Sequence, residues 1–171
     1  MKRRPSLPLF KSIEPEVYVI DTSSWVNIDA RADAEDVWTL VVTLIEQGRS
    51  VACAQVLGEL RDNPFYLSRL KPYEDALKAG DGNNDDPAYL QHVGRITMEH
   101  PGMCKPTGWK TRADPYVVAL AELEKHVVVA DETLDNRPNR KIPGVCRTRG
   151  IRCITLDEFV REARASLEKK P

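Results

Sequence analysis

Short apolar runs that alternate with helical segments constrain the fold of this chain more than any other feature of its sequence. Residues 17–20 (VYVI) and 127–130 (VVVA) are rich in β-branched side chains and are too short for helices, so each is predicted to be a buried strand. Residues 50–54 and 151–156 are predicted to be two further short strands. Strands that are separated by helices favour an α/β domain with a central, mostly parallel sheet.

The segments between these strands carry the spacing and boundary signals of helices. Residues 33–48 repeat apolar side chains at helical spacing and end in glycine. Two Asp-Pro pairs, at 86–87 and 114–115, place proline at a first helical position, and Thr155 with Glu158 is a capping pair for the last helix. Helices are predicted at residues 33–48, 55–63, 65–70, 73–80, 86–100, 114–125 and 157–167, and loops at 81–86, 105–112 and between Asp131 and residue 151.

The length of 171 residues fits one domain with a sizeable core. We expect residues 1–15 to be a flexible N-terminal tail, residues 16–165 to be the domain and residues 166–171 to be a C-terminal tail. The formal net charge of -1 excludes a generally basic nucleic-acid binder, so any such affinity must come from a local patch. No apolar run approaches the ~18 residues of a membrane span, and the N-terminal apolar stretch is too short for a signal peptide. We therefore expect a cytoplasmic protein with no membrane partner.

Four acidic residues lie where the predicted elements could bring them to one edge of the sheet. Asp21 and Asp131 each follow a predicted strand, and functional groups in open parallel sheets gather outside the carboxyl ends of the strands. Glu59 lies in the helix after the second strand, and Asp114 opens the helix before residues 127–130. Carboxylates repel one another unless a hard cation lies among them, and Mg²⁺ and Mn²⁺ take such oxygen ligands. One or two of these ions can activate water for phosphodiester hydrolysis.

Each of these acids also has a structural interpretation. Asp21 and Asp114 are placed where they could cap the helices that follow them, as Asp86 is expected to do. Glu59 could be a solvated helix residue and Asp131 a turn residue. Composition alone does not separate the two sets of interpretations.

Four motifs, in their order along the chain, resemble those of the PIN domain family. They are VYVIDTSSW at 17–25, QVLGEL at 55–60, ADPYVVALA at 113–121 and VVVADE at 127–132. The resemblance implies a three-layer α/β/α fold around a mostly parallel sheet. The resemblance also implies that the family's catalytic, metal-binding acids correspond to Asp21, Glu59, Asp114 and Asp131. It further implies that the hydroxyls of Thr22 and Ser23 orient the first of these acids.

The fourth acidic position is ambiguous, because the motif continues as VVVADETLDN. Glu132 and Asp135 are alternatives to Asp131, which we prefer because it leaves the strand end directly and so has the most rigid support. If the acids share metal ions, their carboxylates should converge within roughly one side-chain length. The later segment RKIPGVCRTRGIRCITLDEF, residues 140–159, is similar to that of a PIN-like subgroup of unknown function.

The resemblance implies a Mg²⁺- or Mn²⁺-dependent endoribonuclease. It further implies RNA as the substrate, and a toxin of a toxin–antitoxin pair that is masked by an antitoxin protein and forms a homodimer. The alternative is a PIN-like RNA-binding or regulatory protein in which catalysis is weak or absent.

Basic residues near the predicted site are candidates for binding RNA. Between Asn136 and Cys153 there are six basic residues and no acidic ones, and further basic residues surround Trp109, which could stack on a base. The alternative is a solvated surface loop with a core tryptophan. The candidate phosphate-binding residues are Lys110, Arg112, Arg137, Arg140, Lys141, Arg147 and Arg149.

Overall fold

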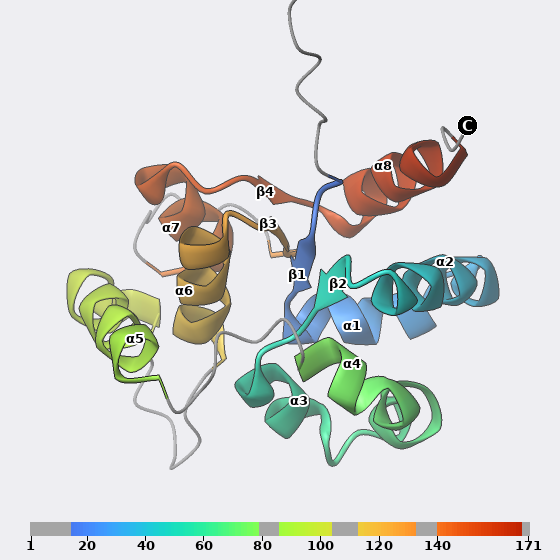
Figure 1. The fold of residues 1–171 in the computed structure, drawn as a ribbon, viewed down its shortest axis with the longest axis horizontal. Coiled ribbons are helices and arrows are strands. Elements are labelled where there is room, and N and C mark those ends of the chain that lie inside the picture. The colour runs from blue at the N-terminus through green and yellow to red at the C-terminus, as the bar shows by residue number, and fades with distance from the viewer. Residues whose placement is uncertain (1–14, 79–85, 104–112, 133–139, 169–171) are drawn as a thin grey trace, which may run out of the picture.

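The computed structural model describes residues 15–78, 86–103, 113–132 and 140–168 (Figure 1). Its centre is a four-stranded sheet in the order β2-β1-β3-β4, and every neighbouring pair of strands is parallel. The strands are β1 (Tyr18–Ile20), β2 (Ser50–Val51), β3 (Val127–Val129) and β4 (Cys153–Ile154). The predicted α/β class with a parallel sheet is confirmed.

Eight α-helices surround this sheet within the described ranges. A π-helical turn, η1 (Tyr66–Leu70), and a 3-10 turn, η2 (Lys71–Tyr73), connect α3 to α4, and a second 3-10 turn, η3 (Pro101–Met103), follows α5. The helices are α1 (Thr22–Asp29), α2 (Ala34–Glu46), α3 (Ala54–Leu60), α4 (Glu74–Lys78), α5 (Pro87–Glu99), α6 (Asp114–Glu124), α7 (Ile142–Arg149) and α8 (Leu156–Glu168).

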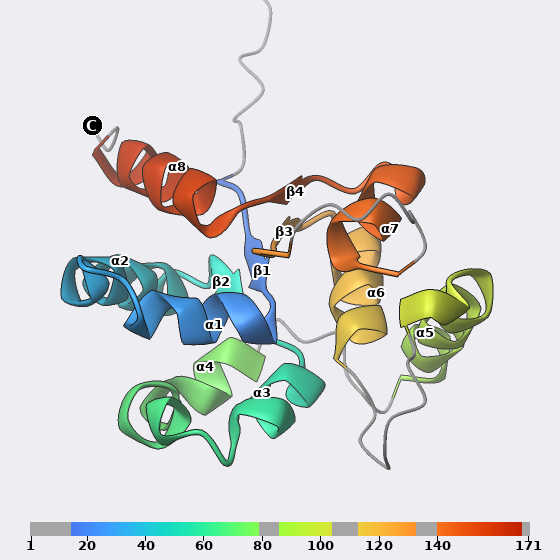
Figure 2. The same ribbon diagram turned by 180° about the vertical axis from the view of Figure 1, so that it is seen from behind.

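The helices form layers on the two sides of the sheet. Helices α2 and α8 pack together on one side, and α6 lies on the other side with α5 outside it (Figures 1 and 2). The strands are therefore covered on both faces, which agrees with the complete burial of β1 and β3. This arrangement is consistent with the predicted three-layer α/β/α fold. None of the helices in the described part of the chain is long and apolar enough to cross a membrane.

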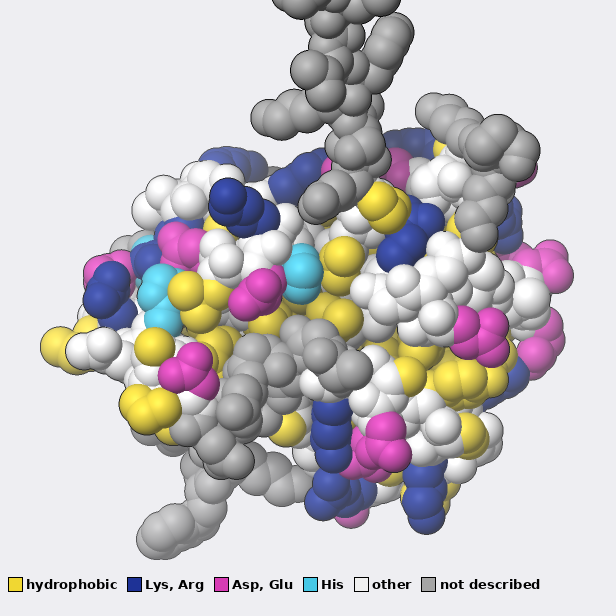
Figure 3. Space-filling model, in the orientation of Figure 1, with side chains coloured by type: hydrophobic (Ala, Val, Ile, Leu, Met, Phe, Trp, Pro, Cys, Tyr) yellow, Lys and Arg dark blue, Asp and Glu magenta, His cyan; other side chains and the backbone are white. Residues whose placement is uncertain are grey.

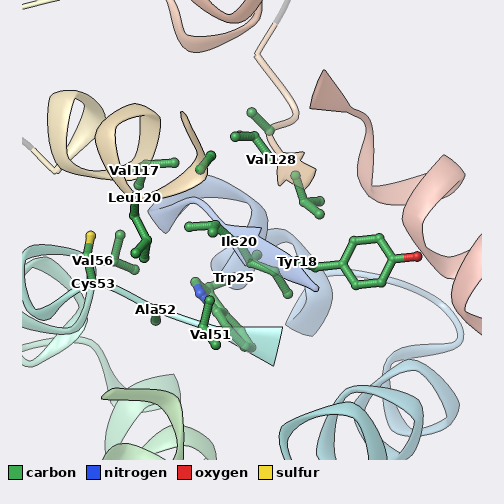
Figure 4. Close-up of a cluster of buried hydrophobic side chains, with 14 of the residues drawn as sticks. Tyr18, Ile20, Trp25, Val51, Ala52, Cys53, Val56, Val117, Leu120 and Val128 are labelled. Carbon is green, nitrogen blue, oxygen red and sulfur yellow. The ribbon is translucent and has the colours of Figure 1, made fainter. Parts of the chain in front are cut away.

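The core between the layers is a single cluster of apolar side chains (Figure 4). Tyr18 points from β1 toward α8, where its ring meets that of Phe159 edge-on at a centroid distance of 5.0 Å. Val117 and Leu120 fill the other side of β1 from α6. Because α6 lies between the sheet and α5, it is buried on several faces, which explains its almost continuous apolar sequence.

Helix α7 corrects the prediction of a loop between Asp131 and residue 151. Ile142, Val145 and Cys146 are buried at helical spacing, and Gly150 ends the helix in the left-handed conformation with φ 71°. The apolar stripe of this segment is short, and the helix was not predicted because basic residues surround it. The described ranges also contain shorter strands than predicted, because only two residues pair in each of β2 and β4.

The helix boundaries otherwise follow the sequence signals. Thr155 and Glu158 form the expected capping pair, since the Glu158 carboxylate accepts hydrogen bonds from both the backbone N–H and the hydroxyl of Thr155, at 2.9 and 3.1 Å. Asp86 caps α5 by accepting a hydrogen bond from Ala88 N at 2.9 Å. Helix α8 continues to Glu168, past the expected end of the domain at residue 165.

Candidate functional site: an acidic pocket at the sheet edge

A pocket of about 390 Å³ lies at the carboxyl ends of β1 and β3. Four of the side chains around it are carboxylates, and they come from separate parts of the chain. We call it the acidic pocket, and its lining consists of Asp21, Thr22, Ser23, Val26, Asn27, Glu59, Asp114, Glu132 and Ile142.

Asp21 is the most buried of these acids, with 5% of its surface exposed. It follows β1 and is the N-cap of α1, because its Oδ1 accepts a hydrogen bond from Ser23 N at 2.5 Å. Its Oδ2 accepts a second bond from the Ser23 hydroxyl at 2.9 Å. Asp21 therefore caps a helix, as its structural interpretation predicts, and it also lines the pocket, so the cap does not decide against a functional role.

Burial raises the pKa of Asp21 to about 6, because the charged form loses its hydration. The hydrogen bonds from Ser23 oppose this rise in pKa, and the negative charge of Glu132 adds to it. The ionised form of this buried carboxylate would be stabilised by a nearby positive charge. A cation in the pocket would supply that charge.

Glu59 is held by residues from two other elements. Thr22 Oγ1, at the start of α1, donates a hydrogen bond to Glu59 Oε2. Ala113 N donates to Glu59 Oε1 at 3.0 Å. The predicted orienting roles of Thr22 and Ser23 thus have a geometric basis, although in this structure Thr22 orients Glu59 and Ser23 orients Asp21.

Asp114 and Asp86 share an Asp-Pro sequence but differ in their surroundings. Asp86 is exposed and caps α5, as predicted. Asp114 is partly buried, is the first residue of α6 rather than its N-cap, and lines the acidic pocket. The dipeptide alone does not separate the two sites, but the position of α6 against β1 and β3 does.

Glu132, and not Asp131, is the fourth acid of the pocket lining. Asp131 directs its carboxylate to other partners, accepting hydrogen bonds from Leu156 N at 2.8 Å and from Asn27 Nδ2 at 3.2 Å. The Oε2 atom of Glu132 accepts a hydrogen bond from Ile142 N at 3.1 Å. The preference for Asp131 as the fourth acid therefore stays a prediction, and in this structure the alternative Glu132 lines the pocket while Asp131 does not. Asp135 lies outside the described residues.

The donor set of the acidic pocket consists of oxygen atoms, which suits Mg²⁺ or Mn²⁺. Among the described residues, no group of three or more His, Cys, Asp or Glu side chains is arranged to hold a metal ion. Of the four acids expected to converge, Asp21, Glu59 and Asp114 share the pocket with Glu132, but they do not form a preformed ligand shell. Each carboxylate oxygen that accepts one hydrogen bond keeps a second lone pair for a cation.

Three helices begin at this pocket. Thr22 opens α1, Asp114 opens α6 and Ile142 opens α7, and all three residues belong to the lining. The N-terminal end of a helix carries a partial positive charge. The three helix ends therefore partly offset the repulsion among the four carboxylates.

The basic residues of α7 differ in their availability to a ligand. Arg149 has 12% of its side chain exposed and forms ion pairs with Glu122, at 2.7 Å, and with Glu99. Its predicted role in binding RNA is therefore not supported, because its guanidinium group is already paired with two carboxylates. Arg140 and Arg147 are exposed and have no ion pair with a described residue, and Lys141 directly precedes α7.

The other basic candidates, Lys110, Arg112 and Arg137, lie outside the described residues, as does Trp109. On the face drawn in Figure 3, basic and acidic side chains are interspersed over the described surface. This distribution agrees with the net charge of -1.

Three pocket residues were not anticipated from the sequence. Val26 and Asn27 follow Thr22 and Ser23 by one helical turn, so they share the pocket-facing side of α1. A helix predicted from Thr22 onward would have indicated both. Ile142 was missed because α7 itself was missed.

The fold and the site together define an α/β protein with an acidic pocket at the carboxyl edge of a parallel sheet. The chain matches the family model described as Domain of unknown function (DUF4411) over residues 18–167, and it belongs to that family. The match runs from β1 to α8 and includes every residue of the pocket lining. None of the curated proteins with which the chain was compared matches it.

Proposed function

We propose that this protein is a PIN-like, metal-dependent endoribonuclease whose active site is the acidic pocket. The observation that carries the proposal is that Asp21, Glu59, Asp114 and Glu132 line one pocket although they are widely spaced in the sequence. Grouping three further carboxylates around the nearly buried Asp21 is unfavourable without a cation. A divalent cation in the pocket would compensate the repulsion among these carboxylates.

In the proposed reaction, the four carboxylates would hold Mg²⁺ or Mn²⁺, and the protein would position an RNA phosphodiester beside it. The bound cation would supply an activated water and stabilise the leaving oxygen. Ser23 and Thr22 keep the carboxylates of Asp21 and Glu59 in place through their hydrogen bonds. The N-terminal ends of α1, α6 and α7 favour a negatively charged phosphate near the pocket.

Basic residues in α7 and just before it support a nucleic-acid substrate. Arg140 and Arg147 are exposed, and α7 begins at the pocket with Ile142. Contacts from such residues to phosphates position a strand without reading its sequence. The likeness of the motifs to the PIN family extends the proposal to a toxin role in the cytoplasm, with an antitoxin that covers the pocket and with a homodimeric assembly.

A second function is favoured by the absence of a preformed ligand shell among the described residues. Carboxylates that share a pocket without enclosing an ion are also expected of a PIN-like protein that binds RNA and cleaves it weakly or not at all. Both functions predict that the protein binds RNA, and they differ in whether metal-dependent cleavage follows.

A cleavage assay on labelled single-stranded RNA separates the two functions. We expect cleavage by the wild-type protein with Mn²⁺, none with EDTA, and none by Asp21→Asn. Asp86→Asn is the matched control, because Asp86 caps a helix away from the pocket, and this variant should cleave as the wild type does. RNA binding without cleavage under all conditions would favour the regulatory function, and cleavage by Asp21→Asn at the wild-type rate would refute the proposed site.

A further inference from the structure

Asp131 and Glu132 are consecutive acids with different surroundings. Glu132 is partly buried, lines the acidic pocket and accepts a hydrogen bond from Ile142 N. Asp131 is exposed and does not belong to that lining. An exposed acid next to a pocket acid is usually of no consequence, but the contacts of Asp131 are unusual for a surface residue.

Asp131 is held by two helices that are far apart in the sequence. Its Oδ1 accepts a hydrogen bond at 2.8 Å from Leu156 N, the first residue of α8. Its Oδ2 accepts a bond at 3.2 Å from the Nδ2 atom of Asn27 in α1. Its own backbone N–H donates to the hydroxyl of the fully buried Ser24 at 3.1 Å. Hydrogen bonds therefore hold both the backbone and the side chain of Asp131.

These contacts determine where the next residue points. The chain is still attached to the sheet edge at Ala130, whose N–H donates to Ile154 O at 3.0 Å. In an extended chain, consecutive side chains point to opposite sides. With Asp131 fixed toward Leu156 and Asn27, Glu132 faces the pocket and reaches Ile142.

We propose that Asp131 is a positioning residue, which fastens the chain after β3 to α1 and α8 and thereby directs the Glu132 carboxylate into the acidic pocket. Asn27 takes part in the same attachment, as the donor from α1. The catalytic meaning of this role rests on the proposed function. The geometric part does not, because it concerns only the hydrogen bond between Ile142 N and the Glu132 carboxylate.

Two substitutions at Asp131 separate a positioning residue from a metal ligand. Asp131→Asn keeps a carbonyl oxygen for Leu156 N, and its new NH₂ group can donate to Asn27 after a flip of the Asn27 amide. Asp131→Ala removes both acceptors. A positioning residue is rescued by the Asn variant, whereas a ligand that acts by its charge is not. Glu132→Ala is the reference for complete loss of the pocket carboxylate.

Glu158→Ala is the matched control for damage to α8. Like Asp131, Glu158 supports the N-terminal end of this helix, through its bonds from Thr155, but within the described residues it forms no hydrogen bond with Asp131 or Glu132. A purely structural effect of Asp131→Ala on α8 should therefore be reproduced by Glu158→Ala. A positioning effect on Glu132 should not be.

Two measurements on the full chain decide the matter. The first is hydrogen exchange of the Ile142 amide in EDTA, which reports on the Glu132 acceptor without any metal. We expect exchange about tenfold or more faster in Asp131→Ala and Glu132→Ala, and little changed in Asp131→Asn and Glu158→Ala. Wild-type protection of this amide in Asp131→Ala would overturn the positioning role.

The second measurement is Mn²⁺ binding by isothermal titration calorimetry. We expect the Kd to rise about 10- to 100-fold in Asp131→Ala and to stay near the wild-type value in Asp131→Asn. If Asp131→Asn weakens binding as much as Glu132→Ala does, Asp131 is a ligand and the proposal fails. If the wild type binds no Mn²⁺, the proposed function fails, while the exchange of the Ile142 amide still decides the positioning role.

Discussion

Thr22 and Glu59 are 37 residues apart in the sequence and are joined by a hydrogen bond from the hydroxyl to the carboxylate. The contact connects the first residue of α1 to α3. The other Glu59 oxygen accepts from Ala113 N, immediately before α6. One carboxylate therefore holds three segments together at the pocket, and its orientation depends on the Thr22 hydroxyl.

Removing that hydroxyl should weaken both the fold and the site. We expect Thr22→Ala to lower the free energy of unfolding by ~1–2 kcal/mol, because a hydrogen bond to a charged group is lost in a partly buried place. Thr22→Ser keeps the hydroxyl and should lose much less. Urea denaturation of the two variants checks this, and equal stabilities would show that the hydrogen bond contributes nothing.

In the metal-free protein, the contribution of Asp21 to stability should fall as the pH rises through the range in which Asp21 ionises. The pKa of Asp21 is raised from 3.8 to about 6 in the folded state, so between these values the folded protein binds more protons than the unfolded chain. The contribution of Asp21 to the free energy of unfolding therefore falls across this window, and the full penalty is present above pH 6.

Asp21→Asn should remove that penalty while keeping one acceptor for Ser23. In EDTA at neutral pH we expect the variant to be more stable than the wild type, by at most about 3 kcal/mol, because folding raises the pKa of Asp21 from 3.8 to about 6. The difference should shrink as the pH approaches 4. Urea denaturation at several pH values tests this expectation, which fails if the variant is the less stable protein at neutral pH.

Arg149 should matter for stability and not for RNA. Its ion pair with Glu122 is largely shielded from solvent, so Arg149→Ala leaves a partly buried carboxylate with the His92 ring but without its guanidinium partner. We expect a loss of roughly 2–3 kcal/mol in the free energy of unfolding, somewhat below the range for a fully buried pair. RNA affinity below the melting temperature should be unchanged. A weaker affinity of the fully folded variant for RNA would show that Arg149 takes part in RNA binding.

Arg140 and Arg147 should show the opposite behaviour. Both are exposed, so replacing them with alanine should leave stability nearly unchanged. The slope of log affinity for single-stranded RNA against log salt should fall by ~0.7 for each lost phosphate contact. Arg95→Ala, an exposed substitution on α5, is the control and should change neither quantity. An unchanged slope in the variant that lacks both Arg140 and Arg147 would show that RNA does not contact these two residues.

The parts of the fold that could be predicted are those in which local pattern and tertiary burial agree. The run VYVI became the fully buried β1, and the stripe of Val37, Leu40 and Leu44 became the buried face of α2. Helix α7 was missed because Arg147 and Arg149 dominate the composition of an eight-residue segment. Its burial depends on neighbours such as α6, which local sequence does not specify.

The acidic pocket was predictable to the extent that strand ends and helix starts determine position. Asp21 and Asp114 are at such points, and both line the pocket. The choice between Asp131 and Glu132 was not predictable in this way. It follows from the hydrogen bond of Asp131 to Leu156 N, 25 residues later in the chain.

The most direct test of the acidic pocket as a metal site is thermal unfolding with and without Mn²⁺. At about a hundred times its Kd, a cation that binds only the folded state stabilises it by ~2.7 kcal/mol. For a chain of this size that corresponds to a rise in Tm of roughly 5–10 °C. We predict this rise for the wild type and for Asp86→Asn, and no rise for Asp21→Asn. An equal rise in Asp21→Asn, or none in the wild type, would contradict the account.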